Sequence, residues 1–226
     1  MKKIFLCLCL TILSVPAMCE TLLTNSAYDA AINKWEKTQV VFKNGTTTSF
    51  SGCQNFYHDL INYGSVRNFE NKDGNEIKEP DREVIISVAN ECFILNSLRN
   101  RHYTRTSINH VLDMSKVILT YPATMILAIS PEEALRKDSF AKKLTLKEYD
   151  PSLSVNGKNE IIDSKYTIYH FSSLGEYKNS KGKVQLIKLR NYSGDGGSFK
   201  NTSYYYVTKH KNDVFQAKEL SVFKLE

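Results

Sequence analysis

Residues 81–98 read DREVIISVANECFILNSL, and this stretch decides the first half of the fold. Apolar residues recur in it at helical spacing and share one sector of a helix: Ile85, Val88, Ala89, Cys92, Phe93 and Leu95. Such a stripe is typical of a helix that packs on a core. The stretch therefore predicts an amphipathic helix with Cys92 on its buried face.

A second helix is predicted at residues 51–64, upstream of the first. Apolar residues there follow the i, i+3, i+4, i+7, i+8 pattern of a buried helical face: Cys53, Phe56, Tyr57, Leu60 and Ile61. Ser51 can cap the start of this helix, and Gly64 stands where a helix ends. Cys53 and Cys92 are thus both expected to face inward from helices.

The first nineteen residues have the order of a secretory signal. Lys2 and Lys3 precede an uncharged apolar run from Ile4 to Val15, and small residues follow a proline before Glu20. The run is shorter than the ~20 residues that a membrane-spanning helix needs. We expect cleavage before Glu20 and export to the periplasm or the medium. Cleavage after Ala17, an uncleaved anchor and lipidation at Cys19 are the alternatives.

The cysteine count supports one disulfide. Three of the five cysteines lie within the signal, so only Cys53 and Cys92 remain in a mature chain. A pair of cysteines in an exported protein is typical of a disulfide. A thiol nucleophile or a metal ligand is the alternative, which an oxidising compartment and the absence of a CxxC spacing disfavour.

The remaining part of residues 25–143 is expected to be mostly helical. Residues 25–42 open as a helix, but residues 40–50 also fit a hairpin with an Asn44-Gly45 turn. Residues 65–80 are polar and are expected to form a loop. Helices are predicted at residues 108–119, before Pro122, and at residues 130–143.

Residues 144–226 change to a β-rich pattern. Strands are predicted at residues 166–171, 184–189, 203–208 and 214–225, with hairpin turns at 179–182 and 211–213. Helices followed by an antiparallel meander indicate an α+β fold. We expect residues 20–226 to form a single domain, in which disulfide-linked N-terminal helices pack on one face of the C-terminal sheet.

Composition and motifs exclude several classes of function. The chain is 42% hydrophobic and 24% charged, which is not the composition of a disordered protein. Its net charge of +6 falls to +4 when Lys2 and Lys3 leave with the signal, and no nucleic-acid partner is indicated. We expect no membrane-spanning segment in the mature chain. No metalloprotease, lipase-type, P-loop or dinucleotide motif is present.

An Arg-rich segment is the first candidate for binding a partner. Arg99, Arg101, His102, Tyr103 and Arg105 fall within seven residues, and they could hold an acidic protein surface or simply be the solvated end of a helix. Residues 204–206 are three consecutive tyrosines. Because a strand has two faces, Tyr205 points to one face and its two neighbours to the other. One of these faces therefore reaches solvent or a partner, unless helices cover the second face as well.

Two weaker chemistries are also represented. Asn191, Ser193 and Asp195 alternate before Gly196, which resembles the first half of a calcium-binding loop, although Asp195 is the one charged ligand. A Gly-rich turn is the alternative. His58 precedes Asp59, and His110 lies three residues before Asp113, so either histidine could serve as a general base.

The sequence therefore favours an exported, non-enzymatic binding protein without a cofactor, of the inhibitor or immunity type found in bacterial envelopes. Its expected partner is a protein of unknown identity. The alternatives are an exported hydrolase that uses His110 or His58, and a calcium-dependent envelope module that uses Asp195.

Overall fold

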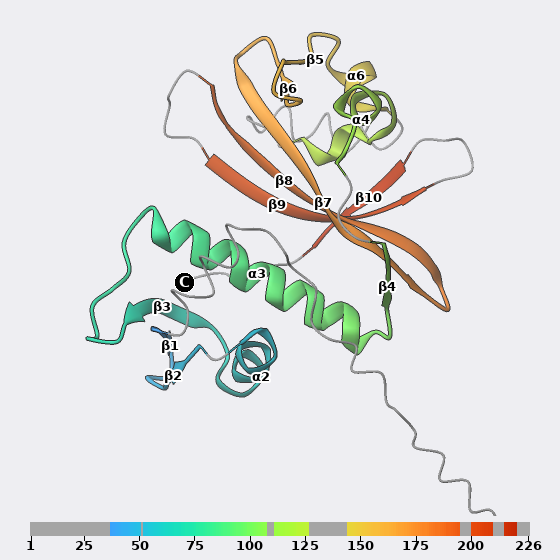
Figure 1. Ribbon diagram of the computed structural model, residues 1–226. Coiled ribbons are helices and arrows are strands. Elements are labelled where there is room, and N and C mark those ends of the chain that lie inside the picture. The colour runs from blue at the N-terminus through green and yellow to red at the C-terminus, as the bar shows by residue number, and fades with distance from the viewer. Residues whose placement is uncertain are drawn as a thin grey trace, which may run out of the picture.

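The computed structural model describes residues 37–50, 52–107, 111–126, 144–194, 200–209 and 215–220. In this part of the chain, two antiparallel sheets lie on opposite sides of one long helix, α3 (Asp81–Asn100) (Figure 1). The smaller sheet has three strands and the larger has seven. The predicted α+β fold, with disulfide-linked helices packed on a C-terminal meander, is confirmed.

The smaller sheet has the strand order β2-β1-β3 and is built from β1 (Thr38–Phe42), β2 (Thr47–Ser49) and β3 (Val66–Asn71). The Asn44-Gly45 turn joins β1 to β2, and the Asn44 side chain accepts a hydrogen bond from the Thr46 N–H at 2.9 Å. The hairpin alternative is therefore the right one for residues 38–49, whereas residues 25–36 lie outside the described residues.

The strand β3 overturns the prediction of a loop throughout residues 65–80. It pairs antiparallel with β1, and its buried side chains are Val66 and Phe69. These two residues are three positions apart because the pairing register shifts between Val41 and Phe42. A strand with an irregular register shows no two-residue periodicity, so its polar sequence resembles a loop.

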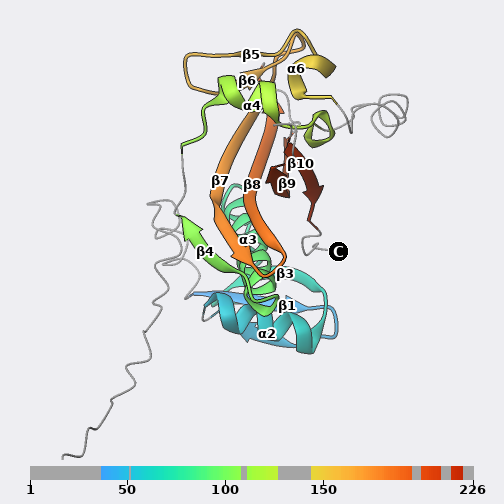
Figure 2. The same cartoon turned by 90° about the vertical axis from the view of Figure 1, so that its right-hand side faces the viewer.

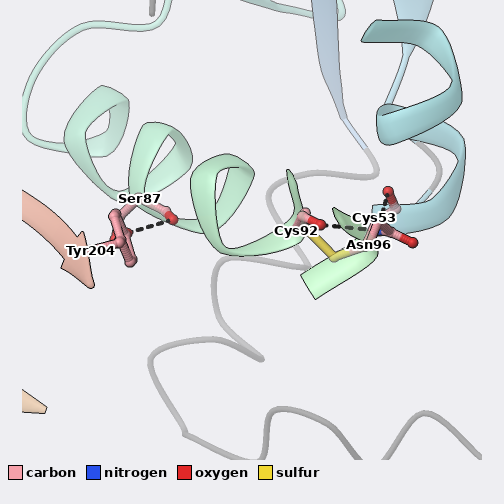
Figure 3. The surroundings of a disulfide bond; sticks show 5 residues. All are labelled: Cys53, Ser87, Cys92, Asn96 and Tyr204. Atoms are coloured by element: carbon pink, nitrogen blue, oxygen red, sulfur yellow. Dashed lines mark hydrogen bonds between the residues drawn. A yellow bond between two sulfur atoms is a disulfide. The ribbon is translucent and has the colours of Figure 1, made fainter. Parts of the chain in front are cut away.

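The helix α2 (Cys53–Tyr63) is confirmed and ends at Gly64, while Ser51 lies outside the described residues. The Cys53–Cys92 disulfide joins α2 to α3, with the two Cα atoms 5.0 Å apart (Figure 3). The Asn96 side chain donates hydrogen bonds to the carbonyl oxygens of Cys53 and Cys92, at 3.2 and 3.0 Å. Disulfide and amide together hold the two helices at one crossing point.

The helix α3 is buried on two opposite faces. One face packs Ile85, Ala89 and Cys92 into the core of the smaller sheet. Ile94 and Leu98 lie about half a turn round the helix and contact the larger sheet. The sequence predicted only the first face, because the second one also contains polar residues that are paired within the fold.

The larger sheet is a meander of β7 (Thr167–Asn179), β8 (Gly182–Ser193), β9 (Lys200–Lys209) and β10 (Phe215–Glu219). Two short strands, β5 (Ser154–Val155) and β6 (Ile161–Ile162), extend the sheet sideways at the start of β7, where β6 pairs with β7 and β5 pairs with β6. The strand β4 (Thr104–Ser107) pairs with the end of β7. The strands predicted at residues 166–171, 184–189 and 203–208 are confirmed as parts of β7, β8 and β9, and so is the turn at residues 179–182. Of the strand predicted at residues 214–225, β10 confirms residues 215–219, whereas residues 214 and 221–225 lie outside the described residues. The turn at 211–213 lies outside the described residues.

Helices cover both faces of this sheet, which corrects the prediction of one covered face (Figures 1 and 2). The face opposite α3 packs against α4 (Met114–Thr120), the 3-10 turn η1 (Ala123–Met125) and α6 (Leu146–Tyr149). The helix α4 begins later than predicted, because the Asp113 side chain caps it by accepting a hydrogen bond from the Ser115 N–H at 3.0 Å. Residues 108–110 and the helix predicted at 130–143 lie outside the described residues.

No helix within the described ranges is both long enough and apolar enough to cross a membrane.

Candidate functional site

The C-terminal end of α3 lies beside the tip of the β7–β8 hairpin (Figure 1), and both segments contain several Lys and Arg residues. Strand β4 follows α3 closely and pairs Thr104 with Lys178 near the end of β7. The chain therefore brings together two sequence segments that are about 75 residues apart. We call this group the cationic end, and its members are Arg99, Arg101, Arg105, Lys178, Lys181 and Lys183.

The backbone holds the cationic end in a defined shape. His102 adopts a left-handed conformation with a φ of 57°, and its N–H donates to the Arg99 carbonyl at 2.9 Å. The Thr104 hydroxyl donates to the Lys178 carbonyl at 3.2 Å, and the Asn179 amide donates to the Arg101 carbonyl at 3.5 Å. The helix end, β4 and the hairpin tip are thus joined to one another.

Tyr103 and Arg105 lie against the sheet. The Tyr103 ring stacks on Tyr206, with ring centroids 6.5 Å apart and planes inclined by 27°. Burial raises the pKa of Tyr206, and the positive charge of Arg101 opposes that rise. Arg105 Nε donates to the Ser107 carbonyl at 3.1 Å. It lies beside Gly175, at an irregularity in the β7–β8 pairing, where a Cβ would lie 3.0 Å from Arg105 Nε.

Five members of the cationic end form no ion pair with any described residue: Arg99, Arg101, Lys178, Lys181 and Lys183. All five side chains are exposed. Several like charges without an ion pair to a described acid create a positive potential at this end of the described structure. The sequence pointed to the arginines, but the lysines could be added only once β4 was paired with β7.

Tyr205 does not fit its expected role as a contact residue. It is only 3% exposed, and its hydroxyl donates to the Met125 carbonyl at 3.1 Å. Tyr204 is buried on the other face of the sheet, where its hydroxyl donates to the Ser87 carbonyl (Figure 3). A covered ring cannot reach a partner, and both faces are covered here.

Of the two histidines of the hydrolase alternative, the structure describes His58. His58 Nδ1 lies 2.9 Å from the Asn62 amide on the exposed side of α2. Asp59 follows it on the same helix, Asp113 caps α4, and His110 lies outside the described residues. The histidine that does approach a carboxylate is His170, whose Nδ1 is 3.8 Å from Glu160 Oε1. Sequence reasoning missed this pair because Glu160 lies in the β5–β6 turn and His170 lies in β7, so only the folded chain brings them together.

Ser87 and Lys188 resemble a nucleophile and its base, since Ser87 Oγ is 2.6 Å from Lys188 Nζ. Glu91 Oε1 is also 2.6 Å from that ammonium, so Lys188 forms a charge-assisted hydrogen bond with Glu91. Ser87 lies inside α3, where backbone N–H groups bond within the helix and cannot stabilise an oxyanion. This cluster therefore attaches α3 to the sheet.

Asn191 and Ser193 lie in β8 rather than in a free loop. They pair across the sheet with Tyr169 and Thr167, and Asn191 is buried. Asp195 lies outside the described residues. Across the residues that can be placed, no three His, Cys, Asp or Glu side chains gather into a metal site. The calcium site stays a prediction.

Comparison of the chain with protein-family models, with curated proteins and with solved structures finds no match. Function must therefore be inferred from the surface itself, and we take the cationic end as the candidate site.

Proposed function

We propose that this chain is an exported binding protein, of the inhibitor or immunity type, that recognises an acidic surface of a partner protein through its cationic end. The observation that carries the proposal is the convergence of six cations from α3, β4 and the β7–β8 hairpin, five of them without an ion pair to a described acid. The signal-like start and the Cys53–Cys92 disulfide support export to the periplasm or the medium.

The chemistry of the cationic end suits carboxylates. Arginine presents forked donors that match a carboxylate, and the lysines around it add a longer-range field. Such a field increases the rate of association with an acidic partner and weakens as salt rises. The Tyr103–Tyr206 stack adds a firm aromatic surface beside the arginines.

A rigid surface also favours binding. Hydrogen bonds from the Thr104 hydroxyl and the Asn179 amide to backbone carbonyls already hold the helix end to the hairpin tip. Little main-chain entropy is then lost when a partner docks, so more of the contact energy appears as affinity.

The test compares two double variants that each lose two exposed positive charges. Arg99→Ser with Arg101→Ser alters the cationic end, whereas Lys72→Ser with Lys78→Ser alters the distant loop before α3. Partners are captured from an envelope extract by the mature protein, purified, and titrated against all three forms. We expect the arginine variant to bind at least about tenfold more weakly and the control to bind normally. Equal affinity of both variants, or no captured partner, would count against the proposal.

Export is tested separately by mass spectrometry of the protein recovered from cells. The expected product begins at Glu20 and contains no free thiol. A product that retains residues 1–19, with Cys53 and Cys92 reduced, would contradict the exported location.

A further inference from the structure

A cavity with polar and apolar walls lies at the other end of β7 from the cationic end. It has a volume of about 600 Å³ and opens between the β5–β6 turn and the first residues of β7. The residues that matter for its chemistry are Asn156, Lys158, Glu160, Ile168 and Tyr192. The cavity takes no part in the function proposed above.

A partly buried carboxylate forms one wall of the cavity. The Glu160 side chain is 13% exposed, and it accepts hydrogen bonds from the Asn156 amide at 3.0 Å and from the Tyr192 hydroxyl at 2.8 Å. The Asn156 hydrogen bond is the main cause that lowers the pKa of Glu160, so the group is ionised at neutral pH. Each carboxylate oxygen has room for about two hydrogen bonds, so acceptor positions remain for a ligand.

The turn that positions this carboxylate is held in advance of any ligand. Asn156 Oδ1 accepts from the backbone N–H groups of Lys158 and Glu160, at 3.0 and 2.9 Å. The Asn156 amide then points to Glu160, which in turn orients the Tyr192 hydroxyl. A prearranged set of polar groups is what a small-ligand site requires.

The cavity also contains apolar surface and a donor. Ile168 and Tyr192 are directly paired across β7 and β8, so their side chains lie together on one face of the sheet. The ammonium of Lys158 and the ring of His170 are close enough to Glu160 to lower its pKa. The positive charge of Lys158 disfavours a cationic ligand, and the carboxylate of Glu160 disfavours an anionic one.

We propose that this cavity binds a neutral saccharide. Neighbouring hydroxyls of a sugar would donate to Glu160, Lys158 would donate to a sugar oxygen, and the C–H face of the ring would pack on Tyr192 and Ile168. A saccharide has both the donors and the apolar face that these groups match, and it has no charge to be repelled.

The test is a titration of the isotopically labelled full chain with three neutral probes, namely chitotriose, cellotriose and maltotriose, followed by NMR. We expect at least one probe to cause saturable shifts in the amides of residues 156–160 and 192–194. Glu160→Gln should weaken that probe about tenfold, because a hydrogen bond to a charged acceptor is lost. Glu219→Gln, an exposed carboxylate on β10, is the matched control and should bind normally.

Lys158→Ala serves as a second variant because Lys158 is exposed and its loss should leave the fold intact. It should also weaken binding. The proposal is overturned if no probe reaches saturation by a concentration of about 10 mM. It is also overturned if the amide shifts lie outside residues 156–160 and 192–194, or if neither variant weakens binding. Tighter binding of galacturonic acid than of every neutral probe would also overturn it. None of these results depends on the cationic end.

Discussion

Replacing Glu91 by Gln should strongly destabilise the packing of α3 on the larger sheet. Glu91 Oε1 lies 2.6 Å from Lys188 Nζ, and the two side chains are only 8% and 17% exposed. Removing one partner of a buried ion pair leaves the other charge uncompensated, which typically costs about 3–5 kcal/mol. Lys188 keeps its contact with Ser87 Oγ and some solvent, so we expect about 3 kcal/mol, near the lower end of that range.

The assay is urea denaturation of Glu91→Gln, Lys188→Met and the double variant. Each single change leaves a buried polar group without its partner, whereas the double change removes both. The double variant should therefore lose less free energy of unfolding than the two single variants together, with a coupling of about 1–3 kcal/mol. A loss of about 3 kcal/mol corresponds to a fall in Tm of about 6–12 °C for a chain of this size.

The control is Glu83→Gln, which removes the carboxylate of an exposed pair on the same helix. Glu83 and Lys200 are 3.6 Å apart with side chains 45% and 60% exposed, so we expect a cost below about 1 kcal/mol. The reasoning is refuted if Glu91→Gln costs no more than this control, or if the two single changes are simply additive.

Replacing both Cys53 and Cys92 by Ala should lower the free energy of unfolding by about 4 kcal/mol, from the loop entropy of a 39-residue separation, and a loss below about 1 kcal/mol in urea would contradict this. Gly175→Ala should cost about 1–3 kcal/mol, because Gly175 has a φ of 116° and a Cβ there would lie 3.0 Å from Arg105 Nε. The control Gly157→Ala meets open space, and equal thermal stability of the two variants would count against the reasoning. Because folding lowers the pKa of Glu160, the ionised carboxylate stabilises the fold at pH values above the ordinary pKa of 4.5. This contribution is lost as the pH falls through the lowered pKa. Glu160→Gln should therefore flatten the decline of stability below about pH 4.5, and parallel acid profiles of the two proteins would exclude this contribution.

The features that the sequence predicted correctly depend on local periodicity. The stripe that includes Phe56 and Leu60 marks α2, and the one that includes Ile85 and Cys92 marks α3. Because both stripes include a cysteine, they also predicted which sulfur atoms meet. The alternation in β7, β8 and β9 indicated the meander, since side chains on a strand point to alternate faces.

The features that the sequence could not predict depend on contacts between distant segments. Glu91 and Lys188 are 97 residues apart, and only their meeting explains why charged residues are buried there. The strand β3 becomes recognisable only through its pairing with β1. Covering of the sheet on both faces buries Tyr205, which a two-residue period alone cannot distinguish from an exposed ring.

The same division applies to the two candidate sites. By itself the sequence determined that three arginines lie close together around the end of α3, because they are near neighbours along the chain. Only the tertiary structure decided that Lys178 and Lys183 join them, and that Glu160 meets Tyr192 at the opposite end of β7. The physical reason is that periodicity specifies which way a side chain points within its own element, whereas the pairing register of distant strands specifies what it meets.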